Sequence, residues 1–115
     1  MKNEVFEKIL EERLLKISGV LGNKAKEYAL GGDRLHNFKQ AAAMAQTSQA
    51  KALWGIAMKH LVSVVDLVEG RLPATEYFVN EKIGDLINYL ILLEAVLLEP
   101  IKTEDEWLKG HVDNA

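Results

Sequence analysis

Three polar side chains repeat along one line of an otherwise apolar segment. Glu81, Asp85 and Asn88 are spaced four and three residues apart, so they share one face of a helix. Two carboxylates on one face can reach the same divalent cation, and Mg²⁺ commonly binds through one or two carboxylates while water and substrate phosphates complete its shell. The spacing is compatible with a Mg²⁺ site that has Glu81 and Asp85 as its metal ligands.

A second polar stripe interrupts the apolar segment 54–68. Lys59, Ser63 and Asp66 fall within about 60° of one another around a helix, and His60 lies about 100° from Lys59. A charge on a buried helix is costly unless it is paired, hydrated or bound to a metal. Asp66 could therefore be a third metal ligand, or a carboxylate held by His60 or Lys59.

The same residues also admit a structural interpretation. Lys59 could pair with Glu81 or Asp85 across a helical bundle. Asn88 could then satisfy a remaining hydrogen bond. His60, next to a lysine, suits hydrogen bonding or phosphate contact better than general base catalysis. From spacing alone, a ligand site and an internal ion-pair network both remain open.

Polar residues also gather at the start of the expected helix 34–45. Arg34, Asn37 and Lys39 fall within its first two turns. Basic side chains and the exposed N–H groups of a helix N-terminus both bind phosphate. The alternative is a solvated first turn. The candidate substrate-binding residues are Arg34, Asn37, Lys39, Lys59, His60 and Asn88.

Composition narrows the class of protein. The chain has 115 residues, 49% hydrophobic and 27% charged, with a net charge of −3 and no cysteine. The acidic balance argues against binding nucleic acid by bulk attraction to phosphates, and the lack of cysteine excludes disulfides and zinc–thiolate sites. The N-terminus lacks an apolar signal core, and the longest apolar run is too short to span a bilayer. We expect a cytoplasmic protein with no membrane association and no strong signal for nucleic-acid binding.

Helical periodicity extends through most of the chain. Apolar residues recur at three- and four-residue spacing, and stop signals at Gly19, Gly70 and Pro100 separate the periodic segments. Asp33 is a candidate N-cap for the helix over 34–45, and Thr47 and Ser48 are candidate caps for the helix over 49–69. The expected elements are helices over 3–18, 34–45, 49–69 and 76–99, a helical turn over 24–30, and a short helix from the capping box Thr103–Glu106 to Gly110.

The sequence therefore predicts an all-α fold. It is a single domain over residues 1–115, a helical bundle of four principal helices plus a short C-terminal helix. The helices over 49–69 and 76–99 are apolar on nearly every face, and a small bundle cannot cover all of that surface. We expect a homo-oligomer, with a dimer as the simplest form.

The motifs resemble a known family. They are the segment Asp33–Lys39, the pair Lys59–His60 with Ser63 and Asp66, and the segment Glu81–Leu90. They are similar to small helical phage and prophage proteins that resemble the nucleotide-modification-associated and MazG-like all-α nucleoside-triphosphate pyrophosphohydrolases. The resemblance covers roughly residues 24–98 and is strongest from Glu81 to Tyr89. It implies an oligomeric helical fold, an acidic Mg²⁺ site with Glu81 and Asp85 as the catalytic carboxylates, and cleavage of a nucleotide between its α and β phosphates.

Two features depart from the MazG pattern. That pattern places a glutamate three residues before the aspartate that matches Asp85, and this chain has Lys82 there. It also places a Glu-x-x-Glu pair in the preceding helix, where this chain has Lys59, Ser63 and Asp66. Two functions therefore remain. One is a Mg²⁺-dependent pyrophosphohydrolase or nucleotide-binding protein. The other is a non-catalytic, phage-encoded helical interaction module with a structural Lys/Glu/Asp network, which would act in the cytoplasm of the host cell.

Overall fold

The computed structural model describes residues 1–24 and 32–110, and every regular element in these ranges is helical. The predicted all-α fold is therefore confirmed for the described residues. The four principal helices and the short C-terminal helix all form. The elements are α1 (Asn3–Ile17), η1 (Ser18–Lys24), α2 (His36–Ala45), α3 (Gln49–Val68), α4 (Glu76–Leu98) and α5 (Glu104–Lys109).

Three helices begin at hydroxyl caps. Ser48, Thr75 and Thr103 precede α3, α4 and α5, and each hydroxyl accepts the backbone N–H three residues further on. At α5 the side chain of Glu106 also returns to the backbone N–H of Thr103, which completes the predicted capping box. These local signals place the helix starts as the sequence predicts.

Two boundaries differ from the prediction. The first helix does not stop at Gly19, because it continues as the wider π-helical turns of η1. Helix α2 begins at His36, two residues later than expected. Asp33 instead accepts the N–H of Leu35 at 2.9 Å, so it closes the turn that precedes the helix. The turn expected over 24–30 lies, apart from its first residue, outside the described residues.

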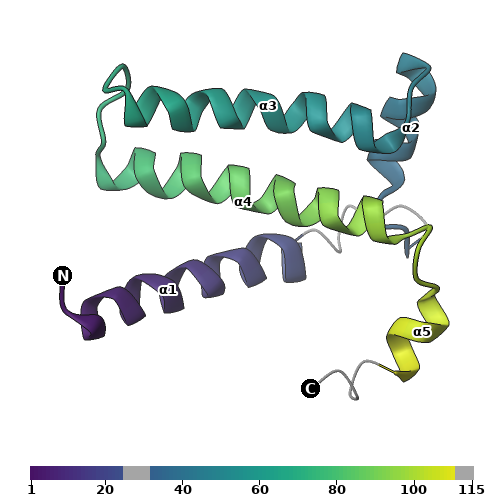
Figure 1. Cartoon of the computed structure of the whole chain (residues 1–115), viewed down its shortest axis with the longest axis horizontal. Coiled ribbons are helices and arrows are strands. Elements are labelled where there is room, and N and C mark those ends of the chain that lie inside the picture. Colours follow the sequence, from purple (N-terminus) through teal and green to yellow (C-terminus); the bar gives the residue numbers. More distant parts are fainter. Residues whose placement is uncertain (25–31, 111–115) are drawn as a thin grey trace.

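The long helices are arranged mainly as one layer. In Figure 1, α3 and α4 run antiparallel and α1 lies along the other side of α4. Helix α2 packs against α3. The buried cluster of Leu35, Leu53 and Val96 lies where α2, α3 and α4 meet. No described helix is both long enough and apolar enough to cross a membrane.

Candidate functional site

The polar line of α4 opens onto a hollow between α4 and α1. Glu81, Asp85 and Asn88 line a volume of about 330 Å³, together with Arg13 and Lys16 of α1. We call it the α1/α4 hollow. It brings two carboxylates, two amides (Asn80 and Asn88) and two cationic side chains into one concave surface. The predicted clustering of the three α4 residues is thus present in space.

Arg13 joins the two helices at this hollow. Its Nη2 donates to the carbonyl oxygen of Asn80 at 3.1 Å. The sequence analysis did not identify Arg13 or Lys16 as site residues, because neither belongs to an unusual stripe in its own helix. The available signal was Gly84, a glycine beside Asp85 in an apolar helix interior, which marks a place of close approach.

Glu81 already has partners within its own helix. Its Oε1 accepts from the ammonium of Lys82 at 2.9 Å. Hydrogen bonds from the Tyr77 hydroxyl and from Lys82 lower the pKa of the Glu81 carboxyl below its ordinary value. The same contact with Glu81 raises the pKa of Lys82. Glu81 therefore stays ionised at neutral pH, and a cation bound there has to compete with Lys82.

Asp85 faces α3 as well as the hollow. One of its carboxylate oxygens lies 3.7 Å from Nδ1 of His60. The His60 ring stacks on Tyr89, with ring centroids 4.6 Å apart and an angle of 16° between the planes. This stacking fixes the direction of the imidazole toward Asp85. His60 of the α3 stripe therefore lies beside Asp85 of α4.

Asn88 carries a side-chain oxygen without a partner. Its Oδ1 is buried and accepts no hydrogen bond among the described residues. A buried polar atom of this kind is costly unless it meets water or a ligand. Because Asn88 also lines the α1/α4 hollow, its side chain can contact a molecule bound there.

The remaining residues of the α3 stripe lie elsewhere. Lys59 is exposed and forms no ion pair within the described chain, so the suggested pair with Glu81 or Asp85 is not formed. The hydroxyl of Ser63 donates to the carbonyl of Lys59 at 3.3 Å. Asp66 accepts from Nε of Arg71 at 2.8 Å instead of from His60 or Lys59. In this chain, Asp66 is engaged away from the α1/α4 hollow.

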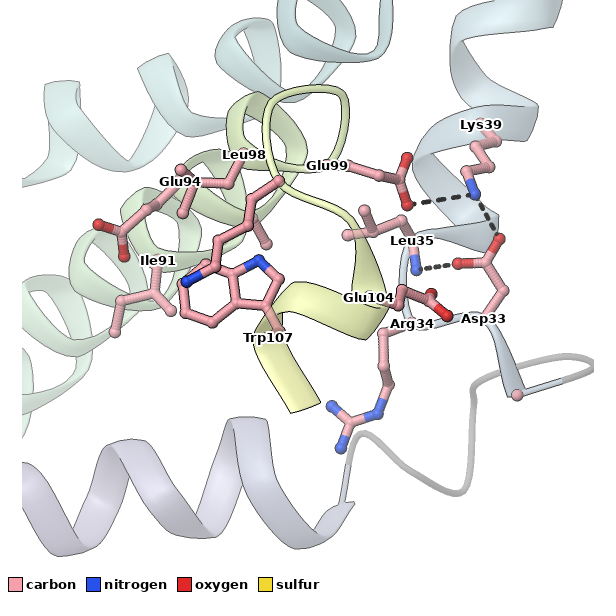
Figure 2. A pocket seen from close by; sticks show the side chains of 13 residues that line it. Asp33, Arg34, Leu35, Lys39, Ile91, Glu94, Leu98, Glu99, Glu104 and Trp107 are labelled. Carbon is pink, nitrogen blue, oxygen red and sulfur yellow. Dashed lines mark hydrogen bonds and ion pairs between the residues drawn. The ribbon is translucent and has the colours of Figure 1, made fainter. Parts of the chain in front are cut away.

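The basic residues near α2 belong to a different hollow. A volume of about 790 Å³ lies between the start of α2, the end of α4 and α5, and Arg34 and Lys39 are among its lining residues. Figure 2 shows Lys39 between Asp33 and Glu99. Its Nζ lies 2.7 Å from Oδ2 of Asp33 and 3.6 Å from Oε2 of Glu99. The hydrogen bond that the Lys39 ammonium donates to Asp33 raises the pKa of Lys39 and lowers that of the Asp33 carboxyl. Two carboxylates thus already neutralise this lysine.

Arg34 and Asn37, two further predicted substrate-binding residues, also lie outside the α1/α4 hollow. The Arg34 guanidinium donates to the carbonyl oxygens of Leu21 and Gly22 at 2.7 and 3.0 Å. It points away from the Asp33–Lys39 cluster (Figure 2). Asn37 is exposed and does not line either hollow. The predicted substrate-binding residues are therefore divided between separate parts of the molecule.

The donor set of the α1/α4 hollow bears on the predicted Mg²⁺. Within the described residues, no three histidine, aspartate or glutamate side chains come close enough to hold a metal ion as a group. An all-protein cage is therefore not formed there. Glu81 and Asp85 do fit the open kind of Mg²⁺ site, in which one or two carboxylates act together with water and substrate phosphates.

Comparison with known proteins adds no relative. No protein-family model matches this chain, and no curated protein or solved structure is detectably similar to it.

Proposed function

We propose that this protein is a cytoplasmic homo-oligomer that binds a nucleoside triphosphate in the α1/α4 hollow and hydrolyses it between the α and β phosphates with Mg²⁺. One observation carries the proposal. Two carboxylates, Glu81 and Asp85, share a single concave surface with two cations, Arg13 and Lys16. This combination suits a metal-bound polyphosphate, which presents positive and negative charge together.

The chain's residues divide the chemistry between them. Arg13 and Lys16 bind phosphate oxygens and stabilise the negative charge that develops as the bond breaks. Glu81 and Asp85 hold the cation, which when bound supplies Lewis-acid activation of the phosphoryl group. The unpartnered Oδ1 of Asn88 accepts a hydrogen bond from a ligand hydroxyl or from the attacking water. Water adds to the α-phosphorus and the bond to the bridging oxygen breaks, giving a nucleoside monophosphate and pyrophosphate.

The size of the hollow limits what it encloses. Its volume of about 330 Å³ is at the lower end of the range of ligand sites, roughly 300–1,000 Å³. It accommodates the phosphates and the ion, and leaves the sugar and base outside. We therefore expect weak discrimination among the nucleobases within one protomer.

The second candidate is a non-catalytic helical interaction module. The observation that favours it is that both carboxylates already have partners: Lys82 beside Glu81, and His60 beside Asp85. In this case the polar residues hold α4 in place and bind no phosphate.

Calorimetry with Mg²⁺ and a non-hydrolysable α,β-imido nucleoside triphosphate separates the two candidates. We expect saturable binding by the wild type, and at least a tenfold weaker Kd for Asp85→Asn and for Arg13→Gln. Lys8→Gln in α1 and Glu94→Gln in α4 are the matched controls, because both residues lie outside the α1/α4 hollow, and both should bind as the wild type does. An absence of binding by the wild type, with all variants folded, would favour the interaction module.

Hydrolysis needs a separate measurement. Incubation of nucleoside triphosphates with the wild type and Mg²⁺ should yield the monophosphate and pyrophosphate in equal amounts, resolved by anion-exchange chromatography. Binding without these products would leave a nucleotide-binding protein and remove the catalytic part of the proposal.

A further inference from the structure

Helix α3 carries an apolar stripe on its exposed side. The stripe consists of Trp54, Met58, Leu61, Val65 and Val68, which we call the α3 seam. The spacing is four, three, four and three residues, which is the repeat of a coiled-coil interface. All five side chains are exposed, by 40% to 78%. The buried residues of the same helix, Leu53 and Ala57, lie to one side of this stripe.

The surface of the chain is too large for a compact monomer. A compact monomer of this mass, 12.9 kDa, has about 6,300 Å² of accessible surface, whereas this chain has 8803 Å². The radius of gyration is 16.6 Å, against about 13 Å for a compact chain of 115 residues. The excess, about 2,500 Å², is roughly three times what each partner buries in an interface of standard size. The chain therefore has ample accessible surface for a stable dimer interface.

We propose that the α3 seam pairs with the α3 seam of a second copy of this chain, antiparallel and across a two-fold axis. Helix α3 lies at the edge of the helical layer, so a second copy can approach it (Figure 1). A two-fold interface brings the same stripe from both copies together, so one apolar seam covers the other. This names the surface for the self-association in the proposed function and rests on that part alone.

The register follows from the spacing. In antiparallel pairs of this kind, Met58 lies opposite Leu61 of the second copy, and Trp54 lies opposite Val65. Lys51, one turn before the seam, then lies beside the end of the partner helix, close to the partner's Glu69. Neither Lys51 nor Glu69 forms an ion pair within the described residues of one chain.

The charges favour this direction over a parallel pair. A parallel pair would bring Lys51 against Lys51 and Glu69 against Glu69, and like charges placed together are destabilising. The antiparallel pair brings each lysine beside a glutamate at both ends of the seam. The proposal therefore specifies the occupant, its direction and its register.

The first test is the mass in solution, measured by light scattering and sedimentation over a range of concentrations. We expect two chains for the wild type and one chain for Leu61→Lys, with helicity unchanged in circular dichroism because Leu61 is exposed in the single chain. Leu15→Lys, the same change at an exposed leucine of α1, is the matched control and should remain a dimer. A monomeric wild type, or a dimer lost through Leu15→Lys and kept by Leu61→Lys, would overturn the proposal.

The second test fixes the direction, and it also decides the case in which Leu61→Lys unfolds or both variants dissociate. The chain has no cysteine, so single cysteines report cleanly. Trp54→Cys and Val65→Cys should cross-link to each other when mixed and oxidised, and neither should cross-link to itself. In the proposed register identical positions are about 16 Å apart along the axis, beyond the reach of a disulfide. Self-cross-linking of either variant would indicate a parallel pair, and no cross-linking at all would reject the α3 seam.

These results are independent of nucleotide chemistry. If the wild type hydrolyses no nucleotide but Leu61→Lys is monomeric, the proposed function fails and the α3 seam stands. If hydrolysis is observed but the cysteine pair does not form, the proposed hydrolysis stands and the α3 seam is rejected.

Discussion

The guanidinium of Arg13 occupies the space beside α4 that a side chain at position 84 would need. A Cβ built on Gly84 would lie 2.5 Å from Nη1 of Arg13. Because glycine has no side chain, Nη2 reaches the Asn80 carbonyl at 3.1 Å, within the backbone of α4. The Arg13 guanidinium therefore uses the space that a glycine leaves in the middle of α4.

Gly84→Ala should loosen α1. Alanine is favoured over glycine in a helix interior by about 1 kcal/mol, but here its methyl group displaces Arg13. Gly55→Ala in α3 is the matched control, because nothing lies within 4 Å of a Cβ there. We expect Gly55→Ala to raise the free energy of unfolding by about 0.5–1 kcal/mol. Gly84→Ala should give no such gain, and α1 amides should exchange faster with deuterium. Equal gains with unchanged exchange in α1 would contradict this account.

The stability of the fold should fall on acidification in a way that depends on Glu81. Hydrogen bonds from Tyr77 and Lys82 lower its folded pKa below the ordinary 4.5, so the unfolded chain binds the proton more readily. The stabilising contribution is therefore fully present above about pH 4.5 and is lost as the pH falls through the folded pKa. Tyr77→Phe and Lys82→Met should each make this loss shallower in urea unfolding at a series of pH values. A slope identical to that of the wild type in both variants would show that these contacts do not stabilise the fold.

Lys59→Met should leave folding nearly unchanged. Lys59 is exposed and has no ion-pair partner within the described chain, so its removal leaves no uncompensated charge. Surface substitutions of this kind change the free energy of unfolding by about 0.5 kcal/mol or less. A loss of about 3–5 kcal/mol in denaturant titration would instead mean a buried pair, as the structural interpretation of the sequence requires.

Arg34→Gln should release η1 from the start of α2. The side chain donates two hydrogen bonds to the carbonyl oxygens of Leu21 and Gly22. Because Arg34 is exposed, we expect a loss of only about 1 kcal/mol in the free energy of unfolding. Faster amide exchange should be confined to η1 and the residues around position 34. Uniformly faster amide exchange throughout α3 and α4 would contradict a purely local role for these two hydrogen bonds.

Leu53→Ala should be among the most damaging changes to the core. Its side chain has no accessible surface and lies in the cluster with Leu35 and Val96. Truncation of a buried leucine costs about 2–5 kcal/mol. Leu108→Ala in α5 is the control, since that leucine is 80% exposed, and it should change the free energy of unfolding by about 0.5 kcal/mol or less. Similar losses from the two variants would place the core elsewhere.

Local spacing determined the helices and the composition of their faces. The caps at Ser48, Thr75 and Thr103 depend on contacts three residues apart, so the sequence contains both partners. The common line of Glu81 and Asp85 along α4 follows in the same way from the helical repeat. These features were predictable because one short segment contains everything that sets them. The continuation of the first helix past Gly19 was not predictable in this way. A glycine ends a helix only when the backbone there leaves the helical conformation.

Only the tertiary structure decided which faces meet. Arg13 reaches the site through the gap at Gly84, although 71 residues separate them, and no local repeat links the two positions. Lys59 is exposed, and Asp66 accepts a hydrogen bond from Arg71. Both follow from the rotation of α3 about its axis, which is set by the packing of Leu53 against other helices. Helical periodicity specifies the angle between residues of one helix. The rotation of one helix relative to the next depends on the shapes of both surfaces, and that information is distributed over the whole chain.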